Sequence, residues 1–179
     1  MCGLLGMLAA TGNVDKYVDA LERSLPCMRH RGPDAAGTWH DGDAAFGFNR
    51  LSIIDLEHSH QPLRWGPEDQ PDRYAMTFNG EIYNYVELRE ELKGLGYTFH
   101  TEGDGEPIVV GYHHWGKDVV NHLRGMFGIV IWDTHTKTMF AARDQFGIKP
   151  LYYATTEAGT VFASEMKCIL EMADELGLD

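Results

Sequence analysis

The chain has 179 residues, of which 44% are hydrophobic and 11% aromatic, enough for the core of one globular domain. Its 27 acidic and 15 basic residues give a net charge of −12, which argues against nucleic acid or an anionic membrane as partner and favours small-molecule chemistry. The 3 cysteines form no Cys-x-x-Cys pair, the histidines lack metal-ligand spacing, and no apolar stretch is long enough to cross a bilayer, so we expect a cytoplasmic protein with no metal site.

Cys2 follows the initiator Met1 and opens a strand-like apolar run over residues 2–8. If Met1 is removed, Cys2 carries both a thiol nucleophile and a free α-amino group that can serve as its base. An α-amino group titrates at about pH 8, so part of it is unprotonated near neutrality. The alternative is that Cys2 is simply a small buried hydrophobe. The position alone leaves both interpretations open.

The first half of the chain combines helix and strand signals. A stripe of apolar residues predicts a helix over residues 14–29, with Cys27 packed beside the stripe. Alternating apolar residues, with the turn 41–43 between the first two segments, predict strands at residues 38–39, 44–49 and 74–78.

Two helices are expected in the middle of the chain. Asn84 begins the first, with Glu87 completing a capping box and Gly96 as the stop. Asp104 begins the second.

A closing helix is expected after Ser164. Strands return in the last third, at residues 127–133, 139–143, 151–154 and 160–163. Runs of strands on both sides of central helices predict an α+β architecture of layered sheets with helices outside.

Asn79 and Gly80 follow a predicted strand. The dipeptide Asn-Gly is typical of a hairpin turn. Here a helix follows instead, and the asparagine amide with the next N–H group can form an oxyanion hole, because both donate hydrogen bonds and glycine allows close approach of a substrate. The dipeptide alone is compatible with either interpretation.

Three charged residues are candidates for holding a substrate. Arg50 continues the apolar alternation of the strand 44–49, so its guanidinium needs a partner, either a carboxylate such as that of Asp34 or the carboxylate of a substrate. Asp104 alone suits a helix cap and Glu81 alone a solvated charge. Either residue could instead hold a substrate ammonium group.

Several motifs occur in order along nearly the whole chain. They are residues 1–3 (MCG), 29–34 (RHRGPD), 50–55 (RLSIID), 79–84 (NGEIYN), 103–106 (GDGE), 143–151 (RDQFGIKPL) and 163–167 (ASEMK). In these motifs the chain resembles the glutaminase domain of class II glutamine amidotransferases, closest to glutamine-hydrolysing asparagine synthetases of the actinobacterial kind. Phe78 favours the synthetases, because relatives that make phosphoribosylamine or glucosamine phosphate usually have His there.

The resemblance implies the N-terminal nucleophile hydrolase fold, a four-layer αββα sandwich of two antiparallel sheets with Cys2 at the end of a central strand. It implies that Cys2 attacks the side-chain amide of glutamine to form a thioester, while Asn79 and the Gly80 N–H group stabilise the oxyanion. It further implies that Arg50 holds the glutamine carboxylate and Glu81 and Asp104 its ammonium. The implied glutamine-binding set is Arg50, Leu51, Ile53, Asn79, Gly80, Glu81 and Asp104.

We expect residues 1–170 to form the glutaminase domain and the acidic residues 171–179 to begin a linker to an ATP-dependent synthetase domain. No pyrophosphate loop of the Ser-Gly-Gly-x-Asp-Ser type occurs in the chain, so no cofactor is expected here, and ATP and Mg are expected on that absent domain. The expected function is glutamine hydrolysis that supplies ammonia for amidation of a carboxylate, aspartate in the first place.

Three alternatives stay open at this point. The acceptor could be another carboxylate, such as one in a cell-wall precursor. The chain could be a non-catalytic glutamine-binding regulatory module in which Cys2 is blocked, or a cysteine hydrolase of another small amide. The sequence also leaves open whether Met1 is removed, whether the protein is a homo-oligomer, and which path the ammonia takes.

Overall fold

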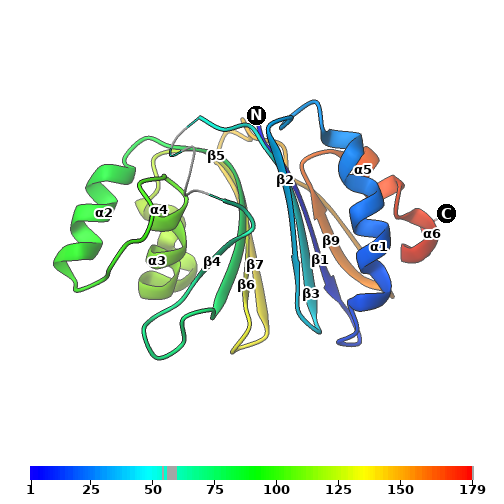
Figure 1. Ribbon diagram of the computed structural model, residues 1–179, viewed down its shortest axis with the longest axis horizontal. Helices are drawn as coiled ribbons and strands as arrows, with labels where there is room; N and C mark the ends of the chain where they lie inside the picture. Colours follow the sequence, from blue (N-terminus) through cyan, green and yellow to red (C-terminus); the bar gives the residue numbers. More distant parts are fainter. Residues whose placement is uncertain (54, 56–59, 179) are drawn as a thin grey trace.

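The computed structural model describes residues 1–53, 55 and 60–178. Two antiparallel sheets face each other, and helices cover the outer face of each (Figure 1). The four layers are therefore helix, sheet, sheet and helix, as expected for the αββα sandwich. None of the described helices has the length and hydrophobicity needed to cross a membrane.

The first sheet surrounds the strand that begins at Gly3. Its strands are β1 (Gly3–Ala9), β2 (Ala35–His40), β3 (Ala44–Arg50), β8 (Tyr152–Thr156) and β9 (Gly159–Ala163), in the order β2-β3-β1-β9-β8. Strand β1 pairs antiparallel with β3 on one side and with β9 on the other. The predicted opening strand is thus confirmed as the centre of a sheet.

The second sheet contains the Asn-Gly dipeptide. Its strands are β4 (Leu63–Trp65), β5 (Tyr74–Ile82), β6 (Gly125–Asp133) and β7 (Thr138–Arg143), in that order across the sheet. Strand β5 continues well beyond the predicted end at residue 78, and pairs with β6 over its whole length. The hairpin-turn interpretation of Asn79 and Gly80 is wrong, because both residues lie inside this ladder.

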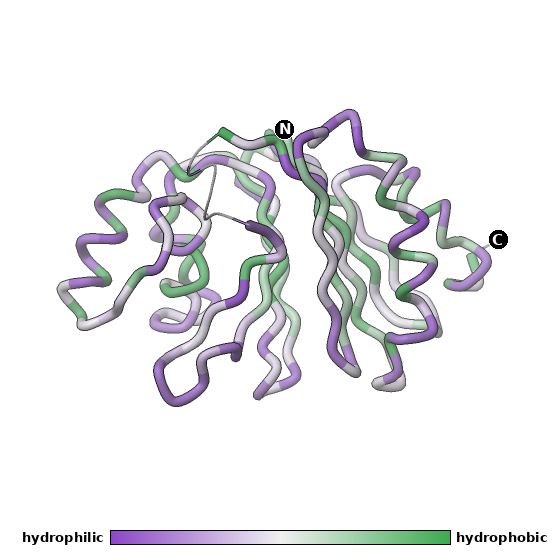
Figure 2. Tube along the Cα trace, viewed as in Figure 1, coloured by the Kyte–Doolittle hydropathy of each residue, from purple (hydrophilic) through white to green (hydrophobic). Residues whose placement is uncertain are grey.

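The helices of the described residues lie in the two outer layers. The first sheet is covered by α1 (Asp15–Ser24), η1 (Leu25–Met28), α5 (Met166–Leu170) and α6 (Ala173–Leu176). The second is covered by α2 (Tyr85–Gly94), α3 (Glu106–Trp115), η2 (Gly116–Asp118) and α4 (Val119–His122). Figure 2 shows that long hydrophobic stretches follow the strands, whereas many of the connections between them are hydrophilic.

Two helix predictions differ from the structure. The helix expected over residues 14–29 changes to a 3-10 helix after Ser24, because Pro26 has no N–H group to continue the α-helical ladder. Asn84 makes no side-chain cap: its Nδ2 donates to the carbonyl of His122 at 2.9 Å, and its Oδ1 accepts from the Arg124 N–H group at 2.9 Å. The predicted capping box is therefore wrong, and Asn84 instead ties α2 to the segment before β6.

A buried apolar layer separates the two sheets. Strand alternation turns one face of each strand into this layer, which consists of Leu4, Ala44, Phe46, Phe48, Ala75, Val130 and Trp132. At one end of the layer, the Trp132 indole N–H group donates to the Asp41 carboxylate at 2.8 Å and links the sheets. These contacts fix how the two sheets face each other and so which groups meet at their open end.

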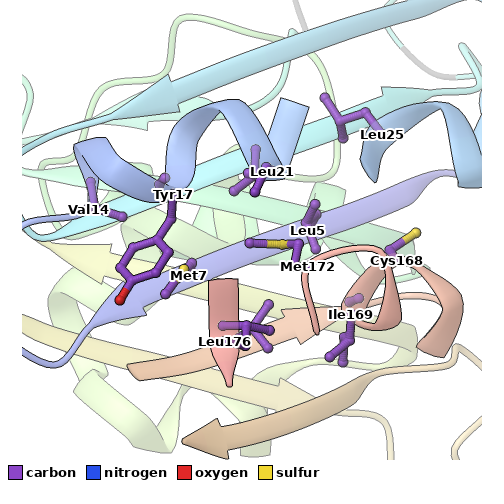
Figure 3. Packing of buried hydrophobic residues seen from close by; sticks show 14 of the residues in the cluster. Leu5, Met7, Val14, Tyr17, Leu21, Leu25, Cys168, Ile169, Met172 and Leu176 are labelled. Carbon is purple, nitrogen blue, oxygen red and sulfur yellow. The ribbon is translucent and has the colours of Figure 1, made fainter. Parts of the chain in front are cut away.

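The C-terminal helices pack on the outer face of the first sheet (Figure 3). Met172 is fully buried and Leu176 is 2% exposed, in the same cluster as Leu5 and Met7 of β1. The two side chains share this cluster with Tyr17 and Leu21 of α1, so α6 is packed against the rest of the domain. The division of the chain at residue 170, with a linker beginning at residue 171, stays a prediction.

Replacing Leu176 with Ala tests this packing. We expect the free energy of unfolding to fall by about 2 to 5 kcal/mol, because the substitution removes buried methyl groups and leaves a cavity. The matched control is Leu170→Ala, whose side chain is 59% exposed and should change stability little. Denaturant unfolding measures both. Equal, small effects of the two substitutions would contradict the packing of α6.

Candidate active site

A pocket lies at the end of the sandwich where the chain begins. It is lined by every predicted site residue, namely Cys2, Arg50, Leu51, Ile53, Asn79, Gly80, Glu81 and Asp104. Figure 1 shows the N-terminus at this end, between the two sheets. The pocket therefore collects residues from both sheets and from the loop before α3.

Strand pairing explains why these residues meet. Gly3 of β1 pairs with Asn49 of β3, so antiparallel pairing puts the start of β1 beside the end of β3 and brings Cys2 next to Arg50 and Leu51. Cys2 packs against the layer between the sheets. Asn79 follows the buried Ala75 by four residues in β5, so the two side chains lie on the same face of the strand. Ala75 belongs to the layer between the sheets, so Asn79 faces the same way.

The Cys2 sulfur contacts both backbone groups of Leu51. The Leu51 N–H group donates to Sγ at 3.3 Å, and the thiol donates to the Leu51 carbonyl at 3.5 Å. Burial raises the pKa of the Cys2 thiol, although the Leu51 contact, the N-terminal ammonium and Arg50 each act in the opposite direction. The thiol is thus protonated near neutrality, and its use as a nucleophile needs a base.

Asn79 presents a hydrogen-bond donor that the described residues leave unused. Its Nδ2 atom is buried, and within residues 1–53, 55 and 60–178 it has no hydrogen-bond partner. An unpaired buried donor costs free energy, so the pocket favours a ligand oxygen at this position. Gly80 follows, where a Cβ atom would lie only 2.1 Å from the Met126 carbonyl oxygen. Only glycine fits there without displacing β6.

Arg50 supplies positive charge on one side of the pocket. Its side chain is buried, and Nη2 donates to the Asp55 carbonyl at 2.7 Å. One interpretation of the sequence pairs Arg50 with the carboxylate of Asp34. In the structure the Asp34 carboxylate accepts the Ser52 N–H group at 2.8 Å, and the Asp34 N–H group donates to the Arg50 carbonyl at 3.0 Å. Asp34 thus supports the backbone that carries Arg50.

Asp104 supplies negative charge to the same pocket. Its Oδ2 accepts the Ile82 N–H group at 3.0 Å, and α3 begins two residues later with Gly105 at the N-cap position. The helix-cap interpretation of Asp104 is therefore wrong. Burial raises the pKa of this carboxyl, and the nearby Glu81 charge acts in the same direction. A cationic group in the pocket would oppose both effects.

The sequence interpretation missed two polar residues of the pocket. Gln61 accepts the Phe78 N–H group at 2.6 Å and donates to the Phe78 carbonyl at 3.0 Å, which fixes β5 one residue before Asn79. Lys149 also lines the pocket and is 7% exposed. Neither residue lies in a helix or strand, so no periodic pattern pointed to them.

In the described part of the chain, no group of three or more His, Cys, Asp or Glu side chains is arranged to hold a metal ion.

The comparisons with known proteins agree with this arrangement. The chain is 55% identical, over its full length, to a Mycobacterium tuberculosis protein provisionally named a glutamine-hydrolysing asparagine synthetase, and 42% identical to asparagine synthetase 1 of Bacillus subtilis. It spans 29% and 28% of the length of these relatives.

Solved structures share the fold at low sequence identity. Glutamine phosphoribosylpyrophosphate amidotransferase from B. subtilis superposes with a TM-score of 0.72 at 21% identity, covering 98% of this chain and 44% of that one. A structure described as the allosteric regulatory enzyme of purine biosynthesis gives a TM-score of 0.77 at 20% identity, covering 96% and 43%. The N-terminal nucleophile hydrolase fold predicted from the motifs is thereby confirmed.

A family model covers almost the whole chain. The model of the glutamine amidotransferase domain matches residues 1–177, which include all the lining residues named above. Because this match extends over nearly the whole chain, the chain belongs to the glutamine amidotransferase domain family.

Proposed function

We propose that this chain hydrolyses glutamine to glutamate and ammonia at Cys2, and that the ammonia serves an ATP-dependent synthetase domain that converts aspartate to asparagine. The unpartnered Nδ2 atom of Asn79, in the pocket that holds Cys2, is the observation that carries the proposal, as judged over the described residues. A donor without a partner in the resting site is free to stabilise charge that develops on a substrate oxygen.

The charges around Cys2 suit an α-amino acid. Arg50 and Asp104 both influence the Cys2 thiol electrostatically, with opposite signs, so the sulfur lies within reach of a cationic and an anionic group. In the proposal the guanidinium of Arg50 binds the glutamine α-carboxylate, and Asp104 with Glu81 binds its α-ammonium. The side-chain amide then extends toward the sulfur, with backbone groups of Leu51 and Ile53 lining the path.

The first chemical step needs the amine of Cys2. Removal of Met1 frees this amine, which accepts the thiol proton as the sulfur attacks the amide carbon of glutamine. A carbon–sulfur bond forms, and the carbonyl oxygen becomes an oxyanion that accepts hydrogen bonds from Asn79 Nδ2 and the Gly80 N–H group. The intermediate collapses when the carbon–nitrogen bond breaks, the protonated amine gives its proton to the leaving nitrogen, and ammonia departs.

The second step releases glutamate. The amine of Cys2, again unprotonated, accepts a proton from water as the water oxygen attacks the thioester carbon. The same two donors stabilise the second oxyanion. The carbon–sulfur bond then breaks, glutamate leaves, and the proton returns to the sulfur, so the site is restored with no net change.

The synthetase reaction is proposed from the relatives. Those named above are called asparagine synthetases, and this chain spans less than a third of their length. We assign ATP and Mg to a separate synthetase domain, and the reaction to the cytoplasm, where the three free thiols of this chain would stay reduced. Asparagine formation by the protein together with that domain, from aspartate, ATP and glutamine, tests the acceptor, and no asparagine would exclude it.

The glutaminase assignment is tested on this chain alone. The chain without Met1 should release glutamate and ammonia from glutamine, and Cys2→Ser should reduce the rate to background because the hydroxyl is a far weaker nucleophile. Cys27→Ser is the matched control and should keep full activity. Cys27 packs against the cluster that contains Leu5 and Met172, and it does not line the pocket. Activity retained by Cys2→Ser would rule out the mechanism.

Asn79→Ala tests the oxyanion hole. We expect kcat to fall by about 10² to 10³ with little change in KM, because the lost donor acts mainly in the transition state. Steady-state glutamate production measures both constants. Asn13→Ala, on an exposed loop, is the control that should match the unmodified chain. A fall in kcat of less than about threefold for Asn79→Ala would exclude an oxyanion role of this magnitude.

Arg50→Met tests recognition of the α-carboxylate. We expect KM for glutamine to rise by about 30-fold or more, because a charge-assisted bidentate contact is lost. The comparison substrate is 4-aminobutanamide, which lacks only this carboxylate and should be handled similarly by both proteins. An equal loss with both substrates would mean that Arg50 supports the fold of the pocket rather than binding the carboxylate.

A further inference from the structure

Asp104 lies on a loop that makes several hydrogen bonds outside the pocket. This loop, residues 100–105, is the last part of the connection between α2 and α3 and has no regular secondary structure of its own. It is held from two sides by charged residues of these helices, Arg89 and Glu106. Both side chains are buried, at 5% and 2% exposure, although neither lines the pocket.

Glu106 binds the start of the loop. Its carboxylate accepts the His100 N–H group at 2.9 Å and 3.0 Å, and it accepts both the N–H group and the hydroxyl of Thr101, at 2.7 Å and 2.8 Å. All these partners donate. A carboxylate can accept from every one of them, whereas a carboxamide has only one acceptor oxygen.

Arg89 binds the other side of the same loop. Its guanidinium donates to the carbonyl of Gly103 at 2.7 Å and to the carbonyl of Thr101, and it lies over the Phe99 ring with 5.0 Å to the ring centroid. All the partners here accept. The carboxylate of Glu106 thus binds N–H groups of residues 100–103, and the guanidinium of Arg89 binds carbonyl groups of the same segment.

The loop also contacts the segment that holds Arg50. The Glu102 N–H group donates to the Asp55 carboxylate at 2.8 Å, while the Asp55 carbonyl accepts from Arg50 at 2.7 Å. One residue therefore touches both the Asp104 loop and Arg50. This contact limits how far the anionic and the cationic side of the pocket can move relative to each other.

We propose that Arg89 and Glu106 are positioning residues that hold the 100–105 loop so that Asp104 faces the α-ammonium group of the substrate. The inference rests on the proposed glutaminase function and deepens it. Recognition of the α-amino group depends on these two buried side chains, which never touch the substrate. Without Arg89 and Glu106, the hydrogen bond from the Ile82 N–H group would be left to hold the Asp104 carboxylate in place. A shift of this carboxylate would weaken its contact with the α-ammonium group and so the preference for substrates that carry one.

The test compares two substrates. Glutaramate has the carboxylate and amide of glutamine but lacks the α-amino group, so the ratio of kcat/KM for glutamine to that for glutaramate reports on ammonium recognition alone. In Glu106→Gln we expect this ratio to fall about tenfold, through a higher KM for glutamine, while kcat for glutamine stays within about threefold. Glu90→Gln is the matched control, because it removes the same charge from the exposed face of α2.

A double substitution shows whether Glu106 acts through Asp104. Asp104→Asn alone should lower the ratio, and adding Glu106→Gln should lower it little further, because residues that act through one contact are not additive. If Glu106→Gln does not fold, as judged by thermal unfolding, Arg89→Lys replaces it, with a smaller fall expected because lysine keeps the charge but not the fork of donors.

The outcomes separate the two proposals. If the unmodified chain does not hydrolyse glutamine, the proposed function fails. If it does, and a folded Glu106→Gln or Arg89→Lys variant keeps the full ratio, the positioning role is excluded while the glutaminase assignment stands. Additive effects of Glu106→Gln and Asp104→Asn would likewise exclude it, since they would place the two residues in separate roles.

Discussion

Antiparallel pairing of β1 with β3 is the constraint on which the rest of the site depends. It places Cys2, at the start of the central strand, beside Arg50 and the backbone of Leu51, and the Leu51 groups contact the sulfur directly. A shift of one residue would turn Cys2 to the opposite face of the sheet, because side chains alternate along a strand. The positions of Cys2 and Arg50 in the pocket are therefore fixed by backbone geometry.

The second sheet completes the site by the same means. The apolar layer holds β5 against the first sheet. Asn79 lies on the face of β5 that meets this layer, and it lines the pocket at the end of the strand. The cost of an unpaired buried amide, as counted over the described residues, is tolerated at Asn79, and the absence of a Cβ atom at Gly80 lets β5 and β6 pair without a clash. The unpaired amide, which lowers the stability of the resting protein, thus belongs to a residue that we assign to catalysis.

Much of this could be predicted from the sequence, for identifiable reasons. The central strands β1 and β3 were placed nearly correctly, because burial on both faces makes each of them a short and largely apolar run. The ordered motifs named Cys2, Arg50, Asn79 and Asp104, which the structure brings to one pocket. Helix ends were less predictable, because Asn84 bonds across the fold rather than to its own helix. Gln61 had no signal of its own, since its partner is the backbone of Phe78, which only the folded chain brings near. Glu106 belongs to the motif at residues 103–106, but the motif gave it no role, because its contacts to the backbone of the preceding loop appear only in the structure.

The central claim is that the first residue of the processed chain performs the deamidation. The most direct measurement is reaction of the folded chain, freed of Met1, with 6-diazo-5-oxo-L-norleucine, an electrophile shaped like glutamine, followed by mass mapping of the modified residue. The account predicts one label, on the sulfur of Cys2, and protection from labelling by excess glutamine. Label on Cys27 or Cys168, or no label at all, would contradict it.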